Sequence, residues 1–147
     1  MHTGAYFLTV VIGGLLALQV GLNAVMRSHT GTALSAALIN FLIGSVALAT
    51  VLFTSRMPLP TGAQLAGAPW WAWLAGLGGA VYVASSAVLG PLIGGAAFLA
   101  CVVAGQMAGS LLLDHYGWIG FPERPLTTAR MIGAALVVLG VVLLARE

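Results

Sequence analysis

An uncharged run in the middle of the chain rules out most soluble folds. Residues 57–113, between Arg56 and Asp114, include no Asp, Glu, Lys, Arg or His. As a single α-helix at about 1.5 Å per residue this run would be roughly 85 Å long, whereas the hydrocarbon core of a membrane is about 30 Å thick. The run must therefore fold back on itself. Gly90-Pro91 is the break with turn chemistry near its middle, because Gly ends helices and Pro suits the first turn of the next one. We expect two membrane helices joined there by a tight turn.

The composition extends this conclusion to the whole chain. Of its 147 residues, 61% are hydrophobic and 5% are charged, against about 25% charged in ordinary soluble domains. Segments of about 20 apolar residues would use most of the chain, which leaves short loops and no room for a soluble catalytic domain. We expect a single all-α transmembrane domain over residues 1–147. Its five expected spans are residues 4–26, 33–54, 70–89, 92–113 and 127–145.

The charge and the first segment exclude two further classes. The net charge of +2 is thinly scattered, whereas nucleic-acid binding needs a clustered basic face. Residues 4–26 lack the basic start of a secretory signal, and their apolar run is longer than that of most signals. We therefore expect this segment to be a retained span and the partner to be the lipid bilayer.

Polar side chains inside the expected spans mark the candidate site. A polar group in lipid must find a partner or face water. One interpretation is hydrogen bonding between helices, worth about 0.6 to 2 kcal/mol for each bond. The other is a shared polar cavity, and carboxamides, which both donate and accept, would suit neutral or zwitterionic cargo, or a cation bound without a countercharge. The candidate cavity residues are Gln19, Asn23, Asn40, Trp73, Tyr82, Ser86, Gln106 and Ser110. Trp73 has the alternative interpretation of a membrane-boundary anchor.

Asp, Glu, Lys, Arg and His are absent from the middle of every expected span. A proton-coupled exporter normally needs a buried titratable carboxylate, so we do not expect coupling through a central acid. Asp114, at the end of one span, and Arg130, near the start of the next, both oppose the dipoles of their helices. We expect these two residues to form a structural ion pair.

Catalytic and metal-binding patterns are also missing from the sequence. His2, His29 and His115 lie at no metal-ligand spacing, and neither phosphate-loop nor dinucleotide-binding glycine motifs occur. Cys101 is the only cysteine, which excludes an intrachain disulfide. We expect a protein that is not an enzyme and that has no cofactor and no metal site.

Glycine spacing and arginine distribution suggest how copies associate. Gly105 and Gly109 lie four residues apart, and Gly133 and Gly140 lie seven apart, so each pair gives a helix face that a neighbour can approach closely. With five spans, Arg56, Arg124 and Arg130 fall on one side of the membrane, and Arg27 and Arg146 fall on the other. Arginine and lysine bias sets orientation, and this bias is small. The hypothesis is an antiparallel dimer of oppositely inserted copies; the alternative is one orientation fixed by lipid or a partner.

The sequence also resembles a known family. The resemblance is strongest in AGQMAGSLLLDHYGWIGFPERPLTTARMIGAALVVLGVVL (104–143), and it extends to LQVGLNAVM (18–26) and to the run WAWLAGLGGAVYVASS. The family that these residues resemble is the five-helix, half-size branch of the drug/metabolite transporter superfamily, the bacterial YdcZ type. The resemblance implies an inner-membrane unit that pairs into a ten-helix (5+5) transporter, with inverted halves around a central site. It implies that the first four helices line the pathway and the fifth helps to hold the dimer. Four-helix multidrug exporters have a glutamate in their first helix, where this chain has Gln19 and Asn23.

We therefore expect a small-molecule transporter that works by alternating access as a dimer, either of this chain or with a paired homologous half. A passive ion or solute channel formed by an antiparallel dimer is one alternative, which currents far above carrier turnover would favour. A non-transporting accessory subunit is the other, and it would move nothing in liposomes.

Overall fold

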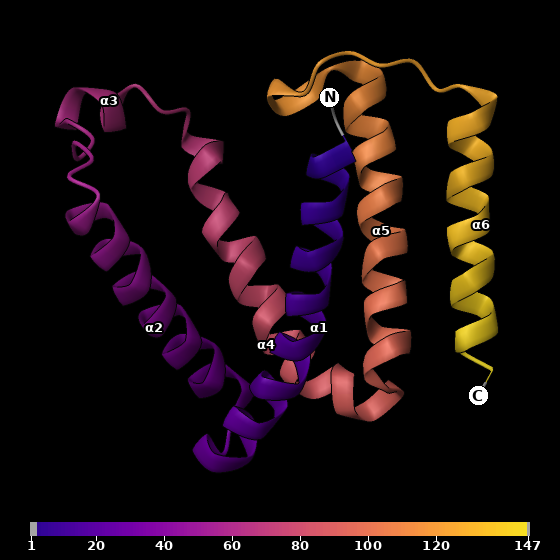
Figure 1. Cartoon of the computed structure of the whole chain (residues 1–147), viewed down its shortest axis with the longest axis horizontal. Helices are drawn as coiled ribbons and strands as arrows, with labels where there is room; N and C mark the ends of the chain where they lie inside the picture. Colours follow the sequence, from indigo (N-terminus) through magenta and orange to yellow (C-terminus); the bar gives the residue numbers. More distant parts are fainter. Residues whose placement is uncertain (1–2, 147) are drawn as a thin grey trace. The chain divides into compact units, whose positions relative to one another are not determined.

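The computed structural model describes residues 3–146, and these residues form helices and loops without a strand (Figure 1). The expected all-α class is confirmed. The chain divides into a first unit that ends at Val88 and a second unit that starts at Leu89, and each is described by itself. The elements in order are α1 (Thr3–Thr30), α2 (Ala33–Thr54), α3 (Gly62–Ala66), η1 (Trp70–Leu74), α4 (Ala75–Ile93), α5 (Gly95–Tyr116), η2 (Trp118–Gly120) and α6 (Thr128–Leu144).

Four helical segments of the described chain are long and apolar enough to cross a membrane: Thr3–Thr30, Ala33–Thr54, Trp70–Ile93 and Gly95–Tyr116. The protein is therefore a polytopic membrane protein. The apolar helix α6 has 17 residues, which corresponds to about 26 Å and lies at the lower limit for a span. The count of five spans stays a prediction.

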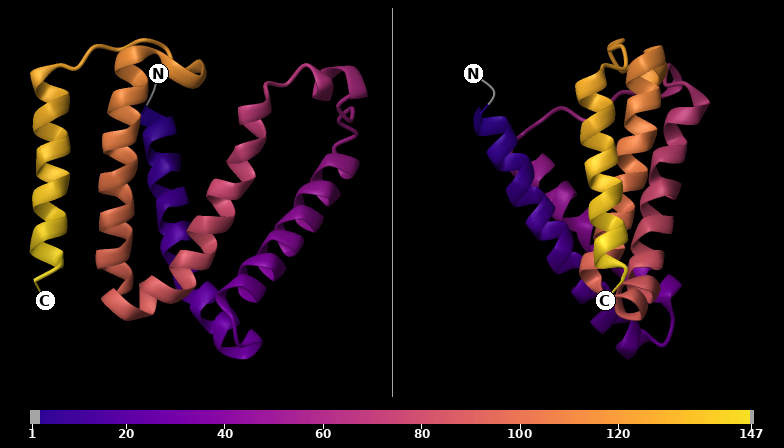
Figure 2. Two further views of the ribbon diagram at one scale, coloured as in Figure 1. Left: turned by 180° about the vertical axis from the view of Figure 1, so that it is seen from behind. Right: turned by 90° about the vertical axis from the view of Figure 1, so that its right-hand side faces the viewer.

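In the first unit, α1, α2 and α4 meet at one end. The C-terminal end of α1 lies beside the N-terminal end of α2 and contacts α4 at Ala87, and α2 and the start of α4 separate toward the loop that contains α3 (Figures 1 and 2). The turn between α1 and α2 needs Gly31, whose φ is 79°, and Thr32, whose hydroxyl oxygen accepts from the Ser35 backbone N–H at 3.0 Å. The buried apolar side chains of this unit are Val20, Ala36, Ala37, Val83 and Ala87.

The predicted turn at Gly90-Pro91 is wrong, because α4 continues through both residues to Ile93. The chain turns instead at Gly94, whose φ of 84° and ψ of 139° suit a residue without a side chain. Proline inside a helix leaves the carbonyl four residues earlier without its donor. Here that carbonyl belongs to Ala87, and Arg27 Nη1 donates to it at 3.3 Å. Arg27 thus supplies the donor that Pro91 lacks.

Other expected spans also begin or end differently. The span 92–113 is shifted to Gly95–Tyr116 as α5. The span 4–26 extends to Thr30 as α1, and the hydroxyls of Ser28 and Thr30 donate to the carbonyls of Val25 and Met26 in its last turn. The span from residue 70 begins with the 3₁₀ turn η1 before α4.

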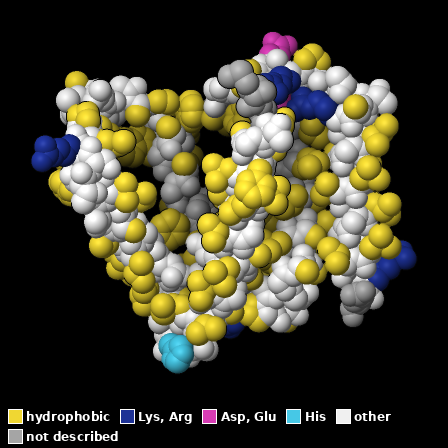
Figure 3. Space-filling view, in the orientation of Figure 1, with side chains coloured by type: hydrophobic (Ala, Val, Ile, Leu, Met, Phe, Trp, Pro, Cys, Tyr) yellow, Lys and Arg dark blue, Asp and Glu magenta, His cyan; other side chains and the backbone are white. Residues whose placement is uncertain are grey.

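In the second unit, α5 and α6 pack side by side and antiparallel (Figures 1 and 2). Helix α5 ends at Tyr116 and is followed by the cap residue Gly117, which is left-handed with φ 61°, and Thr127 caps α6. Large apolar side chains are exposed on the helices, including Phe7 at 72%, Leu48 at 73% and Leu92 at 73%. On the face drawn in Figure 3 these apolar groups lie along the helices and charged groups lie near helix ends, which is the distribution that a bilayer requires.

Candidate functional site

Three helices of the first unit are joined by a buried polar relay, which consists of Asn40, Asn23 and Ser86. Asn40 Nδ2, on α2, donates to Asn23 Oδ1, on α1. Asn23 Nδ2 donates to Ser86 Oγ, on α4, at 2.7 Å. The Ser86 hydroxyl in turn donates to the Val83 carbonyl at 2.8 Å. Asn23 is 1% exposed and Ser86 is 0% exposed, so the relay replaces water for both side chains.

The direction of the relay is fixed by its last bond. The Ser86 hydroxyl has one proton, which it gives to the Val83 carbonyl, so Ser86 can only accept from Asn23. Asn23 must then present its nitrogen to Ser86 and its oxygen to Asn40. Asn40 consequently uses its nitrogen in the relay, and its Oδ1 has no partner among residues 3–146. This oxygen is not among the buried unpaired atoms of the described chain and remains accessible.

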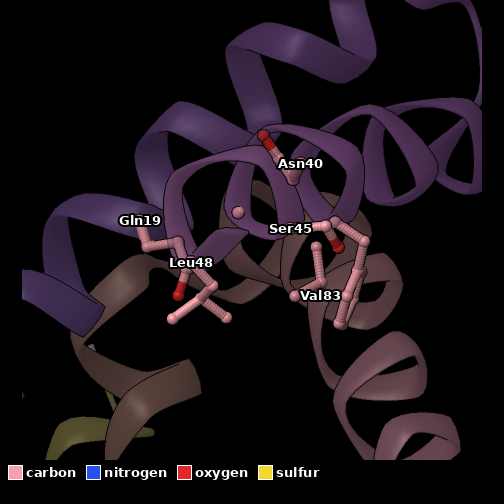
Figure 4. Close-up of a pocket in the computed structure, with 7 residues that line it drawn as sticks. Gln19, Asn40, Ser45, Leu48 and Val83 are labelled. Atoms are coloured by element: carbon pink, nitrogen blue, oxygen red, sulfur yellow. The ribbon is translucent and has the colours of Figure 1, made fainter. Parts of the chain in front are cut away.

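Next to the relay lies a pocket of about 240 Å³, the polar pocket, which opens between α1, α2 and α4 (Figure 4). Its polar side chains are Gln19, on α1, and Asn40 and Ser45, on α2. The remaining lining residues are Phe41, Gly44, Leu48 and Val83.

The polar pocket has spare hydrogen-bonding capacity. Within the described chain, neither the Gln19 carboxamide nor the Ser45 hydroxyl makes a hydrogen bond, and the Asn40 oxygen is unpaired. No charged side chain is among the residues that line the pocket. Polar groups at membrane depth require water or another partner, so these three side chains are suited to bind an uncharged polar group.

Arg27 is the charged residue nearest to the relay in sequence, one helical turn after Asn23 on α1. Its guanidinium donates to the Ala87 carbonyl, directly after Ser86. Arg27 thus ties the end of α1 to the end of α4 and contributes no side chain to the polar pocket. Its role in this structure is to hold the helices that carry the relay.

The other predicted cavity residues of the first unit lie elsewhere. Tyr82 is half-buried on α4, and Trp73 is 60% exposed in η1, and neither lines the polar pocket. The exposed side chain of Trp73 fits the membrane-boundary interpretation.

In the second unit, Gln106 and Ser110 are exposed on α5. Ser110 lines a groove between α5 and α6 together with Met107, Arg130 and Gly133. The structure pairs Arg130 with Asp114, through Arg130 Nη2 and Asp114 Oδ2. Arg130 Nη1 also donates to the Arg124 carbonyl at 2.9 Å, so this one side chain holds the connection between α5 and α6.

The glycines predicted to support helix packing have open faces. A Cβ atom added at Gly105, Gly109, Gly133 or Gly140 would meet no atom within 4 Å outside its own helix. These positions are therefore unobstructed in the single chain.

Sequence reasoning predicted Gln19 and Asn40 and missed the other lining residues of the polar pocket, which are Phe41, Gly44, Ser45, Leu48 and Val83. Leu48 could have been found, because Asn40, Gly44 and Leu48 follow one another at four-residue spacing on one face of α2. Ser45 lies beside that stripe. Phe41 gives no signal, since a phenylalanine in a membrane helix is ordinary.

Comparisons with known proteins agree with the resemblance read from the residues. A family model described as "Putative inner membrane exporter, YdcZ" matches residues 5–143. The chain is 32% identical over 145 residues to the inner membrane protein YdcZ of Escherichia coli (strain K12), and the alignment covers 99% of this chain and 95% of that protein. No solved structure matches the chain.

Proposed function

This chain belongs to the YdcZ family of inner membrane exporters, and from that premise we propose that it moves a small uncharged or zwitterionic molecule by alternating access, as a dimer of oppositely inserted copies. Family membership makes it a multi-pass inner membrane protein and supports membrane transport in general. The cargo, the dimer and the mechanism are the proposal.

The observation that supports this proposal most is the polar pocket. Gln19, Asn40 and Ser45 offer unused donors and acceptors inside an otherwise apolar set of helices. If these groups had a purely structural role, their donors and acceptors would be paired in hydrogen bonds between helices, as those of Asn23 and Ser86 are in the relay. Their free capacity instead favours exchange of partners, which transport of a solute requires.

The pairing of two copies is supported by the incomplete wall of the polar pocket and by unobstructed glycine faces on α6. The polar pocket is bounded by helices on part of its circumference, and a second copy would complete an enclosure. We propose five spans in each copy, with α6 as the fifth. The unobstructed faces at Gly133 and Gly140 on α6 allow close approach of a second helix.

A flux measurement tests the transport proposal. Purified protein in liposomes would be assayed by counterflow with a panel of labelled polyols, amino acids and water-soluble amphiphiles that have a hydroxyl or amide head. The proposal expects saturable uptake of at least one solute, stimulated by the same unlabelled solute inside. Gln19→Leu should abolish this uptake, whereas Leu18→Ile, a lipid-facing control next to it, should not.

Two results would contradict the proposal. Electrical currents far above carrier turnover would indicate a channel. Absence of any flux, together with copurification of one other membrane protein, would indicate an accessory subunit.

The orientation of the copies has its own test. A C-terminal tag would be probed from each face of sealed vesicles. Labelling of part of the population from either face supports oppositely inserted copies. Labelling of every copy from one face would contradict the antiparallel homodimer.

A further inference from the structure

Phe41 stands between two cavities of different chemistry in the first unit. It lines the polar pocket beside Gln19 and Asn40. It also lines a second cavity of about 480 Å³ between α2 and α4. The other residues that line this second cavity, the apolar groove, are mostly apolar and include Leu34, Leu38, Val81 and Ala84, and Ser85 contributes the single hydroxyl.

Gly79 determines where the Phe41 ring lies. A Cβ atom built on Gly79 would lie 3.1 Å from Phe41 Cζ and 3.6 Å from Cε1. The ring therefore rests against bare backbone of α4, and a side chain at residue 79 would displace it. From the same stretch of α4, Val83 lines the polar pocket and Val81 lines the apolar groove. The ring thus forms the partition between the two cavities.

The apolar groove is open to the lipid side. Leu34 is 77% exposed, Leu38 is 62% exposed and Val81 is 66% exposed in the single chain. No charged residue is among those that line either cavity. A molecule that occupied both would need an uncharged hydrogen-bonding head and an apolar chain.

We propose that the cargo is such an amphiphile, with a hydroxyl or amide head in the polar pocket and an apolar chain in the groove, and that Phe41 controls the passage between the two. This inference rests on the proposed transport function and adds the cargo class and a specificity-determining residue. The apolar chain enters the groove from the bilayer and packs against Leu34, Leu38 and Val81. Rotation of the Phe41 ring then admits the head to Gln19, Asn40 and Ser45.

Photolabelling with two octanols tests this directly. One octanol has a diazirine close to its hydroxyl, and the other has a diazirine close to its methyl end. Each is added to the full-length protein in lipid nanodiscs, irradiated, and the labelled residues are found by peptide mass spectrometry. We expect the first to label Gln19, Ser45 or Leu48, and the second to label Leu34, Leu38 or Ala84. Excess unlabelled octanol should lower both signals at least several-fold.

Variants of the partition sharpen the test. Phe41→Ala removes the ring, so each octanol should label both cavities and the separation should be lost. Gly79→Ala displaces the ring while keeping it, and should blur the separation to a smaller degree. Phe53→Ala is the matched control, since Phe53 is on the same helix, 69% exposed, and lines neither cavity.

Three outcomes would overturn the inference: both octanols label the same residues in the unmodified protein, excess octanol does not compete, or Phe41→Ala leaves the separation intact. The first two would mean that the octanols label these residues by non-specific partition from the bilayer. The assay measures binding alone, so flux without separated labelling refutes this inference and leaves transport standing. Separated labelling without flux refutes the transport proposal instead.

Discussion

Replacing each carboxamide of α1 by leucine should have different consequences for stability. Asn23 and Gln19 lie one helical turn apart. Asn23 is 1% exposed and bonds to Ser86 and Asn40, whereas Gln19 makes no hydrogen bond within residues 3–146. Asn23→Leu therefore breaks two bonds between helices, and Gln19→Leu breaks none.

The size of the difference follows from membrane-protein energetics. A hydrogen bond between membrane helices contributes about 0.6 kcal/mol on average and up to about 1.7 kcal/mol. Asn23→Leu should thus lower the free energy of unfolding by roughly 1 to 3 kcal/mol, because both of its bonds are lost. Gln19→Leu should leave stability within about 0.5 kcal/mol of the unmodified protein, since it breaks no hydrogen bond within residues 3–146. The same Gln19→Leu variant should lose transport.

Reversible unfolding in mixed detergent micelles, followed by far-ultraviolet circular dichroism, would measure both variants. A double-mutant cycle of Asn23→Leu with Ser86→Ala should give a coupling of about 0.6 to 1.7 kcal/mol. The reasoning is refuted if Gln19→Leu destabilises as much as Asn23→Leu, or if the Asn23 and Ser86 effects are additive.

Three more outcomes follow from other contacts. Pro91→Ala supplies the missing N–H to the Ala87 carbonyl, so the loss of the Arg27 side chain should matter less in that variant. In the same unfolding assay, Arg27→Gln should lower the free energy of unfolding by about 1 kcal/mol less in the Pro91→Ala background than in the unmodified protein. Equal losses in the two backgrounds would contradict the role given to Arg27. Asp114→Asn should lower the free energy of unfolding by up to about 1 kcal/mol, because it removes the ion pair with Arg130. Arg130→Gln should lower it more, because Arg130 also bonds to the Arg124 carbonyl; the reverse order would refute this. Ile119 has a φ of 56°, so Ile119→Asn should raise stability by about 1 kcal/mol, measured as a higher melting temperature than that of Ile119→Val; no difference between the two would count against strain there.

Local chemistry made part of the fold predictable. Helix α2 begins and ends at the predicted residues Ala33 and Thr54, because a capping Thr32 precedes an uninterrupted apolar run. Thr127 caps α6 for the same reason. The family assigned from residue patterns is confirmed by the comparisons.

Contacts between distant residues account for what the sequence could not predict. The carbonyl of Ala87, which Pro91 leaves without its helical donor, accepts instead from Arg27, 60 residues away along the chain. Asn23 and Ser86 lie 63 residues apart. The sequence pattern identified Asn23 and Ser86 as polar groups within their helices. It could not distinguish a side chain that is hydrogen-bonded to another helix from one that is unpaired. That distinction separates Asn23, a structural residue, from Gln19, a candidate ligand contact.

Whether the polar pocket holds water at membrane depth is the question on which the account depends most. In a variant with Cys101 replaced by Ser, single cysteines would be placed at Gln19, in the polar pocket, and at Leu18, which is 60% exposed at the same depth. Both would be treated in native membranes with a membrane-impermeant methanethiosulfonate. The account predicts rapid modification of Gln19→Cys and none of Leu18→Cys. Equal reactivity at the two positions, or no reaction at Gln19→Cys, would contradict it.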